Sequence, residues 1–332
     1  MKIVIVGAGA VGQVYGHHLA KGGAEVSVFV KPKHQREAER GFVLTRIPWM
    51  GPRVTEKFVP ARVLTSSAEL AAMPRVDQVW LCVPTPALDD ALLHDVCVVG
   101  APRASAVVLS PGYFVRKKVE DALGAARCVF GIIGMSSYHA PLEGSTDPRE
   151  LETPAGLAYF LVPTMLSGVS ERRALDAVST LRAGGCPTKL VSDAASEQVM
   201  SSSTLMPIVA SLEVAGWSMS TFRGDAELAA LTANSMRESA AIASALVGRA
   251  VPWTTSLLGA LTLRAAGFFA PRVSPFDIEA FLRVHFTKVG EQTRMLLGAT
   301  LVEGRRLRLS TAALTELVER LDEARGADRA EP

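Results

Sequence analysis

The chain has almost no net charge. Its 332 residues include 35 basic and 33 acidic side chains, so the formal net charge is +2. A protein that binds nucleic acid or a membrane surface usually carries a strong basic excess, and this balance favours neither kind of partner. Hydrophobic residues make up 48% of the chain, which excludes intrinsic disorder and supplies a sizeable core.

Cysteines are few, and their spacing indicates neither disulfides nor a metal site. None belongs to a Cys-x-x-Cys pair or stands at metal-ligand spacing from a histidine. A chain of this length does not need disulfides to hold its fold. Three of the four cysteines lie in or beside apolar runs, so we expect buried, reduced thiols and a cytoplasmic location. The cysteines are Cys82, Cys97, Cys128 and Cys186.

The sequence also lacks a recognisable targeting or membrane segment. The most apolar later stretch, 253–269, is interrupted by Arg264 and two glycines. It is shorter than the roughly 20 apolar residues that a spanning helix needs. The apolar start, 1–12, resembles a short signal peptide, but its glycines at fixed spacing and the amphipathic stretch after it favour another interpretation. No Ser/His/Asp set stands in a suggestive order, so hydrolytic chemistry is not indicated.

What is present in the first half is an alternation of short apolar runs with helical patterns. This cadence is typical of a parallel sheet with right-handed crossovers. A turn-rich polar stretch follows near residue 144. Strands are predicted over 3–6, 25–30, 78–83, 106–109, 128–133, 157–162 and 188–191. Helices are predicted over 11–21, 88–96 and 172–183, with another after the strand 106–109 that ends near residue 123.

Beyond Asp193 the pattern predicts helices alone. The fold class is therefore α/β, with an N-terminal Rossmann domain over 1–192 and a second, all-α domain over 193–332. Two domains also fit the usual ~150 residues per domain. Helices are predicted over 196–218, 225–246, 254–266, 277–303 and 310–325, with Ser196, Asp225, Asp277 and Ser310 as candidate N-caps.

A Gly-x-Gly-x-x-Gly motif directly follows the first predicted strand and opens the first predicted helix. This context makes an otherwise weak motif specific for a dinucleotide. Gly7 permits the tight turn, Gly9 lets the backbone approach a pyrophosphate, and Gly12 lets the helix pack on the strand. Ala10 and Val11 belong to the first helical turn, whose N–H groups face the phosphates.

The end of the second predicted strand indicates which dinucleotide is bound. NAD-binding proteins place an Asp or Glu about 20 residues after the glycines, where it bonds the ribose 2′-hydroxyl. Here the segment Val28-Phe29-Val30-Lys31-Pro32-Lys33 has no acid and two lysines. The sequence therefore predicts NADP(H), with Lys31 as the residue that contacts the 2′-phosphate; a solvated basic turn is the alternative.

Four segments, in order, resemble the ketopantoate reductase family. They are MKIVIVGAGAVGQVYGHHLAKGG at the start, VWLCVPTPALDDAL, VVLSPGY, and SEQVMSSSTLMP at the opening of the helical half. The resemblance implies a Rossmann domain plus a helical domain, with the active site in the cleft between them, and reduction of a 2-keto acid by NADPH. It also places Pro84 and Gly112 beside the cofactor.

The polar residues of the family's active site are mostly replaced in this chain. Aligned on the proline that closes the motif, the family's lysine becomes Gln198 and its two asparagines become Ser202 and Met206. A family asparagine after the strand ending near residue 109 becomes Pro111, and a lysine after the preceding strand becomes Pro84. The resemblance therefore implies a substrate other than ketopantoate.

Another group must then assist reduction of the carbonyl, because Gln198 can polarise it but cannot release a proton at neutral pH. The helical half contains one lysine, Lys288, which aligns with the second residue of a family Thr-Glu pair. We expect Lys288 to act as the acid or electrostatic anchor, with Gln198, Ser202 and Ser274 as further candidates; a solvent-facing polar stripe is the alternative. At spacings of three and four, the same predicted helical face carries His285, Glu291 and Gln292.

Three functions fit this set of residues. The first is an NADPH-dependent oxidoreductase of the ketopantoate reductase type acting on a carbonyl or imine of a small molecule. The second is an opine- or amino-acid-type dehydrogenase. The third is a catalytically inactive NADP-binding regulatory protein. The long apolar helices of the second half leave room for a homodimer.

Overall fold

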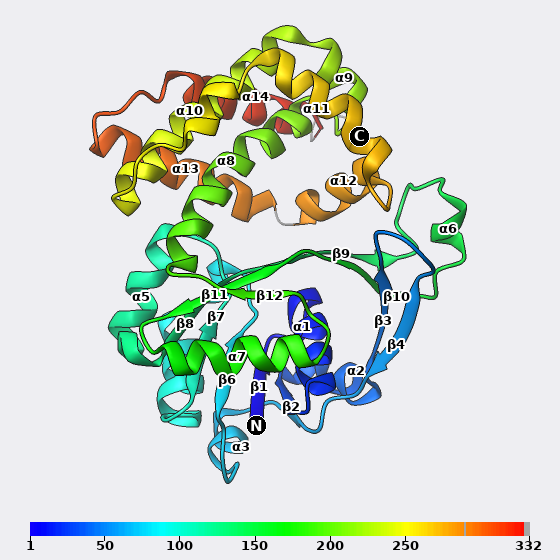
Figure 1. Ribbon diagram of the computed structural model, residues 1–332, viewed down its shortest axis with the longest axis vertical. Coiled ribbons are helices and arrows are strands. Elements are labelled where there is room, and N and C mark those ends of the chain that lie inside the picture. Colours follow the sequence, from blue (N-terminus) through cyan, green and yellow to red (C-terminus); the bar gives the residue numbers. More distant parts are fainter. Residues whose placement is uncertain (289, 329–332) are drawn as a thin grey trace. The chain divides into compact units, whose positions relative to one another are not determined.

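The first strand, β1 (Lys2–Val6), lies inside an eight-stranded sheet in a computed structural model, which describes residues 1–288 and 290–328 (Figure 1). Four of its five residues are buried, as the continuous β-branched run predicts for a strand covered on both faces. Its parallel neighbours are β2 (Glu25–Phe29) and β6 (Gln78–Leu81).

The strand order of this sheet is β12-β11-β8-β7-β6-β1-β2-β5. The chain first moves outward from β1 through β2 to β5, and then returns to the other side of β1 with β6. A reversal of this kind is the topological switch point of a Rossmann fold. Neighbouring strands of this sheet are parallel, except that β11 runs antiparallel to β8. The other strands are β5 (Val63–Leu64), β7 (Ser105–Val108), β8 (Cys128–Ile132), β11 (Thr164–Gly168) and β12 (Thr188–Leu190).

Helices cover both faces of the sheet. Ile3 and Ile5 of β1 join one buried cluster, whereas Val4 and Val6 join another, because alternate residues of a strand point to opposite faces. The first cluster is covered by α1 (Ala10–Lys21) and α7 (Glu171–Ala183), and the second by α5 (Tyr113–Leu123). The shorter helices of this part are α2 (Gln35–Arg40), α3 (Ser67–Ala71) and α4 (Asp90–Leu93), the last continued by a π-helical segment, His94–Gly100.

A second, four-stranded sheet was predicted only in its strand 157–162. Its order is β4-β3-β10-β9, with β10 parallel to β3 and antiparallel to β9. Most of these strands mix polar and apolar residues, so they lack the continuous apolar run that indicates a buried strand. Their bounds are β3 (Phe42–Ile47), β4 (Val54–Phe58), β9 (Met135–Ala140) and β10 (Gly156–Leu161).

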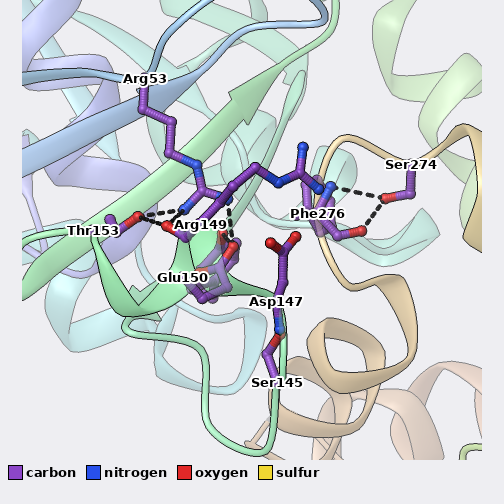
Figure 2. A network of polar contacts seen from close by, with 9 residues as sticks. Arg53, Ser145, Asp147, Arg149, Glu150, Thr153, Ser274 and Phe276 are labelled. Atoms are coloured by element: carbon purple, nitrogen blue, oxygen red, sulfur yellow. Dashed lines mark hydrogen bonds and ion pairs between the residues drawn. The ribbon is translucent and has the colours of Figure 1, made fainter.

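A buried ion pair fastens the edge strands of this second sheet (Figure 2). Arg53, just before β4, places Nη2 2.5 Å from Oε1 of Glu150 in α6 (Pro148–Leu151). Tyr138 of β9 donates its hydroxyl to the same carboxylate oxygen at 2.7 Å. Glu150 is wholly buried, and Arg53 also donates to Thr153. The carboxylate therefore ties a residue beside β4 to β9 on the opposite side of the sheet.

The second half of the chain is helical, as predicted. Among its described residues no strand occurs after Leu190. Its apolar core is built from α10 with the helices around it, including Leu228, Leu297 and Leu317. The predicted fold class, a Rossmann-type α/β part followed by an all-α part, is confirmed. The helices are α8 (Ala194–Val214), α9 (Met219–Gly224), α10 (Ala226–Val247), α11 (Ala260–Val273), α12 (Ile278–Lys288), α13 (Gly290–Arg306) and α14 (Ala312–Asp328).

One predicted helix differs from the structure, and another is described in two parts. The helix predicted over 277–303 is described as α12 and α13; Val289 between them lies outside the described residues, and the continuity of the helix there stays a prediction. The helix predicted over 254–266 begins instead as a 3₁₀ turn, Trp253–Leu257, and α11 starts at Ala260. Apolar periodicity continues through the segment 254–266, so it gave no sign of this interruption.

Two of the four predicted N-caps are confirmed and two are wrong. Asp225 accepts from the Leu228 N–H at 2.8 Å, and Asp277 accepts from the Ala280 N–H at 3.0 Å. Ser196 lies inside α8, where its own N–H donates to Asp193. Ser310 precedes α14 by two residues and donates its hydroxyl to the carboxylate of Glu238. That carboxylate also accepts from the Leu314 N–H and so caps α14 from a neighbouring helix.

The chain forms two compact units. The first comprises residues 1–141 and 148–198, and the second residues 142–147 and 199–332. The predicted division into domains at residue 193 stays a prediction. Among the described residues, no helix combines the length and the hydropathy needed to cross a membrane.

Candidate nucleotide-binding site

A tight glycine loop joins the carboxyl end of β1 to α1. The Gly7 N–H donates to the Phe29 carbonyl at 3.0 Å, which ties the loop to β2. Gly7 has φ +90°, and a Cβ there would lie 3.0 Å from the Cys82 carbonyl oxygen, so both backbone geometry and space require glycine. A Cβ on Gly12 would overlap the Gly7 carbonyl and lie 2.8 Å from Cγ2 of Ile5. The first turn of α1 therefore rests directly on the loop and on β1.

The N-terminus of α1 is open to a ligand. Its N-cap is Gly9, which has no capping side chain, and the first turn contains no acidic residue. A Cβ on Gly9 would meet no atom within 4 Å. The first N–H groups of a helix, here those of Ala10 and Val11, have no partner within the helix and carry its partial positive charge. This cradle fits the pyrophosphate of a dinucleotide.

The loops after β6 and β7 lie at the same edge of the sheet and are bonded to each other. Ser110 donates its hydroxyl to the Val83 carbonyl at 2.8 Å, and Thr85 donates to the Pro111 carbonyl at 2.6 Å. The structure thus brings Pro84 and Gly112, two predicted cofactor residues, to the same edge as the glycine loop, because all three strands are parallel. Gly112 is the N-cap of α5 and also lacks a capping side chain.

The end of β2 is basic and exposed. The N–H of the buried Val30 donates to the Leu64 carbonyl at 2.9 Å, and Lys31 follows at the surface. Lys33 is also exposed, and neither lysine forms an ion pair with any residue that the structure describes. β2 is the neighbour of β1 in the sheet, so both lysines follow the strand next to the glycine loop. The first acid after β2, Glu37, lies in α2 and is not at the strand end.

Helix α1 is held by buried polar groups that the sequence analysis missed. The Tyr15 hydroxyl accepts from the Gly134 N–H at 2.9 Å and bonds Oγ1 of Thr164 at 2.8 Å. Burial raises the pKa of Tyr15, so it stays a phenol. The sequence did offer one signal of this support. A tyrosine on the buried side of a Rossmann helix needs a hydrogen-bond partner for its hydroxyl.

His18, also on α1, bridges to two further segments. Its Nδ1 donates to the Gly184 carbonyl at 2.8 Å, and its Nε2 accepts from the Tyr159 hydroxyl at 3.1 Å. Burial lowers the pKa of His18 to about 4, so the imidazole is neutral at physiological pH. The glycine loop therefore starts a helix that is fixed along its buried side.

The four predicted catalytic residues lie on α8, on α12 and just after α11. Gln198 is half-buried in α8. The Ser202 hydroxyl donates to the Val199 carbonyl at 3.3 Å, and the Ser274 hydroxyl donates to the Phe276 carbonyl at 2.6 Å (Figure 2). Lys288 is the last residue of α12 and is exposed. Their catalytic assignment stays a prediction.

The residues of the helical face predicted around Lys288 lie on both sides of Val289, which is outside the described residues. His285 and Lys288 belong to α12, whereas Glu291 and Gln292 belong to α13. The His285 ring stacks on Phe281 with centroids 5.2 Å apart. In the described part of the chain no group of three or more His, Cys, Asp or Glu side chains could hold a metal ion.

The sheet order, the glycine loop at the switch point and the open N-terminus of α1 define a Rossmann-type dinucleotide-binding fold. Residues 3–143 match the family described as ketopantoate reductase PanE/ApbA. The resemblance read from the sequence is thereby confirmed for this part of the chain. No curated protein sequence matches the chain.

Solved structures resemble the chain over almost its whole length. The 2-dehydropantoate 2-reductase of Methylococcus capsulatus is 19% identical, with a TM-score of 0.68, over 98% of this chain and 97% of its own. The enzyme of the same name from Geobacter metallireducens GS-15 is 16% identical, with a TM-score of 0.70, over 98% and 100%. A D-mandelate dehydrogenase in complex with NADH is 14% identical, with a TM-score of 0.70, over 98% and 99%. At these identities the similarity establishes the fold.

Proposed function

We propose that the chain is an NADP(H)-dependent oxidoreductase of the ketopantoate reductase type. Its substrate is a small molecule with a carbonyl, as in a 2-keto acid, or an imine. The observation that carries this proposal is the uncapped N-terminus of α1 at Gly9, beside the basic end of β2. The helix N-terminus fits a pyrophosphate, and the basic strand end fits a further phosphate.

The choice of NADP(H) over NAD(H) rests on the charge at the end of β2. Lys31 is exposed and forms no ion pair with a described residue, so its ammonium is available to a 2′-phosphate. An NAD-specific strand end would carry an acid that accepts from the ribose 2′-hydroxyl. Such an acid would repel a 2′-phosphate, and none stands here. A similar structure contains NADH, which makes the two-cofactor comparison the decisive test.

Each part of the site has its own role in this proposal. The N–H groups of Ala10 and Val11 hold the pyrophosphate, and the loops containing Pro84 and Gly112 flank the same edge of the sheet. When bound, the dinucleotide supplies a hydride. Gln198 donates an amide hydrogen bond to the substrate oxygen or nitrogen, and Lys288 delivers the proton that the reduced group needs.

The substrate is proposed to be other than ketopantoate. Two family asparagines are replaced by Met206 and Pro111, which offer no side-chain hydrogen bond and so fit a less polar substrate. Ser202 and Ser274 are further proposed substrate contacts, since a hydroxyl that donates to a carbonyl still accepts. A D-mandelate dehydrogenase of similar fold binds anilino(oxo)acetate, a 2-oxo acid with an aromatic group.

We also propose a cytoplasmic location and a homodimer. Burial raises the pKa of Cys97 and of Cys128 to about 11, so these thiols are protonated and unreactive, as suits a reducing compartment. Exposed apolar side chains on α11, Leu261 and Phe269, supply contact area for a second copy.

The first experiment is a titration of the purified protein with NADPH and with NADH, followed by nicotinamide fluorescence. NADPH is expected to bind more tightly, and Lys31→Ala is expected to weaken NADPH about tenfold, because a hydrogen bond to a charged group contributes about 1.5 kcal/mol. NADH binding should not change. Lys189→Ala is the matched control, since this exposed lysine lies on β12 at the far edge of the sheet. Equal affinity for both nucleotides in wild type and Lys31→Ala would refute the cofactor assignment.

Turnover separates an enzyme from an inactive NADP-binding regulator. NADPH oxidation is followed with a panel of 2-keto acids, and with the same acids plus ammonia or an amine for imine reduction. Lys288→Ala should remove activity without changing NADPH affinity. Activity only with the amine present would assign an opine- or amino-acid-type dehydrogenase. Tight NADPH binding without turnover on any member of the panel would favour the regulator.

A further inference from the structure

A cavity lies at the amino-terminal edge of the large sheet, opposite the edge that carries the glycine loop. Its volume is about 610 Å³, within the range of small-molecule sites. Because β1, β6 and β7 are parallel, residues before these strands lie at one edge and the cofactor loops lie at the other. The five residues of β1 separate the two edges by about 15 Å.

Arginines dominate the charge of this cavity. Four line it, together with two aspartates, so the charged side chains sum to +2. Arg75 pairs with Asp77 at 2.6 Å, and the other aspartate is Asp176. The arginines are Arg75, Arg103, Arg172 and Arg173.

Two of the arginines are not committed to the fold. Arg103 and Arg172 are exposed and form no ion pair or side-chain hydrogen bond with any residue that the structure describes. Arg173, in contrast, donates from Nη1 to the hydroxyl of the buried Ser105 at 2.7 Å, which fixes its position on the cavity wall. The cavity thus combines one guanidinium held in place with two that are free to close on a ligand.

The start of α7 adds to the positive potential. Its N-cap, Ser170, lines the cavity and makes no side-chain capping bond, and the first N–H groups of this 13-residue helix have no partner within the helix. Glu171 in the first turn offsets part of that charge, but it does not line the cavity. Guanidinium groups match the oxygen geometry of a phosphate, and side-chain charges that sum to +2 favour a phosphate dianion.

We propose that this cavity binds a small phosphomonoester, such as a sugar phosphate. The ligand's phosphate lies between Arg103, Arg172 and the fixed Arg173, and its uncharged part occupies the remaining volume. The site is separate from the dinucleotide site and does not depend on the proposed function.

The test is a ³¹P NMR titration of ribose 5-phosphate into the full-length protein at low ionic strength. A pentose phosphate without adenine is used because an adenine nucleotide would also enter the cofactor site. The titration is repeated with saturating NADPH. The variants are Arg103→Ala and Arg172→Ala, and the matched control is Arg62→Ala, an exposed arginine of the same unit that does not line the cavity. Melting curves of all four proteins check that they are folded.

Saturable binding is expected, unchanged by NADPH and by Arg62→Ala, and about tenfold weaker in each of the other two variants, as the loss of one charged hydrogen bond predicts. Added salt should also weaken binding, because it screens these partly exposed charged contacts. Three results would overturn the proposal: no saturation in the wild-type protein, displacement of the sugar phosphate by NADPH, or equal binding by the wild-type protein and by folded Arg103→Ala and Arg172→Ala.

Discussion

Replacing two glycines of the loop one at a time separates helix packing from ligand approach. In Gly12→Ala the new methyl group overlaps the Gly7 carbonyl and lies 2.8 Å from Cγ2 of Ile5. Relief requires α1 to move away from β1, but the buried hydrogen bonds of Tyr15 and His18 hold that helix in place. We therefore expect a loss of about 3 kcal/mol in the free energy of unfolding, the upper end of the usual cost of overpacking.

Gly9→Ala should behave in the opposite way. Gly9 has φ −73° and ψ −172°, which any residue adopts, and its added methyl group meets no protein atom within 4 Å. The stability should change by less than about 1 kcal/mol, the usual size of a change at an N-cap. The methyl group does occupy the space beside the uncapped N–H groups of α1. NADPH affinity should fall at least about tenfold, or about 1.4 kcal/mol.

Both variants are measured by urea unfolding and by NADPH fluorescence titration at a temperature where each is folded. The expected pattern is loss of stability in Gly12→Ala and loss of affinity with retained stability in Gly9→Ala. If Gly9→Ala bound NADPH like the wild-type protein, no pyrophosphate would approach Gly9, and the reasoning about the open helix N-terminus would be refuted.

Three further predictions concern the buried polar groups of the first unit. Tyr15→Phe leaves the buried Gly134 N–H without its acceptor, and urea unfolding should show a loss of about 1–3 kcal/mol; an unchanged midpoint would contradict this. The pKa of His18 is lowered from 6.5 to about 4 in the folded protein, so its contribution is complete above pH 6.5 and disappears as the pH falls toward 4. The stability loss over that range is of the order of 3 kcal/mol, and it should be absent from the pH profile of His18→Gln. Arg53→Ala leaves the buried Glu150 carboxylate unpaired and should cost about 3–5 kcal/mol, whereas Arg53→Met combined with Glu150→Met should recover most of it; a double variant as unstable as the single one would argue against this explanation.

The sequence was most informative where structure follows from local chemistry. β1, the glycine loop and α1 were predicted because a β-branched run and three spaced glycines permit few other conformations. β6, β7 and β8 followed from similar apolar runs, since strands buried on both faces are mostly apolar, and β2 followed from a less regular alternation. The second sheet was mostly missed because β3, β4 and β9 contain polar residues such as Thr45, Glu56 and Ser137, which interrupt the apolar pattern.

The candidate site was predictable to the extent that backbone alone forms it. A glycine motif specifies its own geometry, and the parallel strand order then places Pro84 and Gly112 at the same edge. The supports of α1 were not predictable, because the bonds of Tyr15 and His18 reach residues more than a hundred positions away. The start of α11 at Ala260 was missed for a related reason, since periodicity reports which face is apolar and not where a helix begins.

The six residues 142–147 belong to the second unit, although the chain then returns to the first for residues 148–198. Leu142 is only 3% exposed, and a Cβ on Gly144 would overlap the Arg283 guanidinium, so this hexapeptide is packed closely within its unit. During synthesis the hexapeptide leaves the ribosome before the helices of its unit, so it can pack only after residues 199–332 have been made. Because residues 148–198 of the first unit lie between the hexapeptide and the helices, no single cut of the chain releases the helical unit intact.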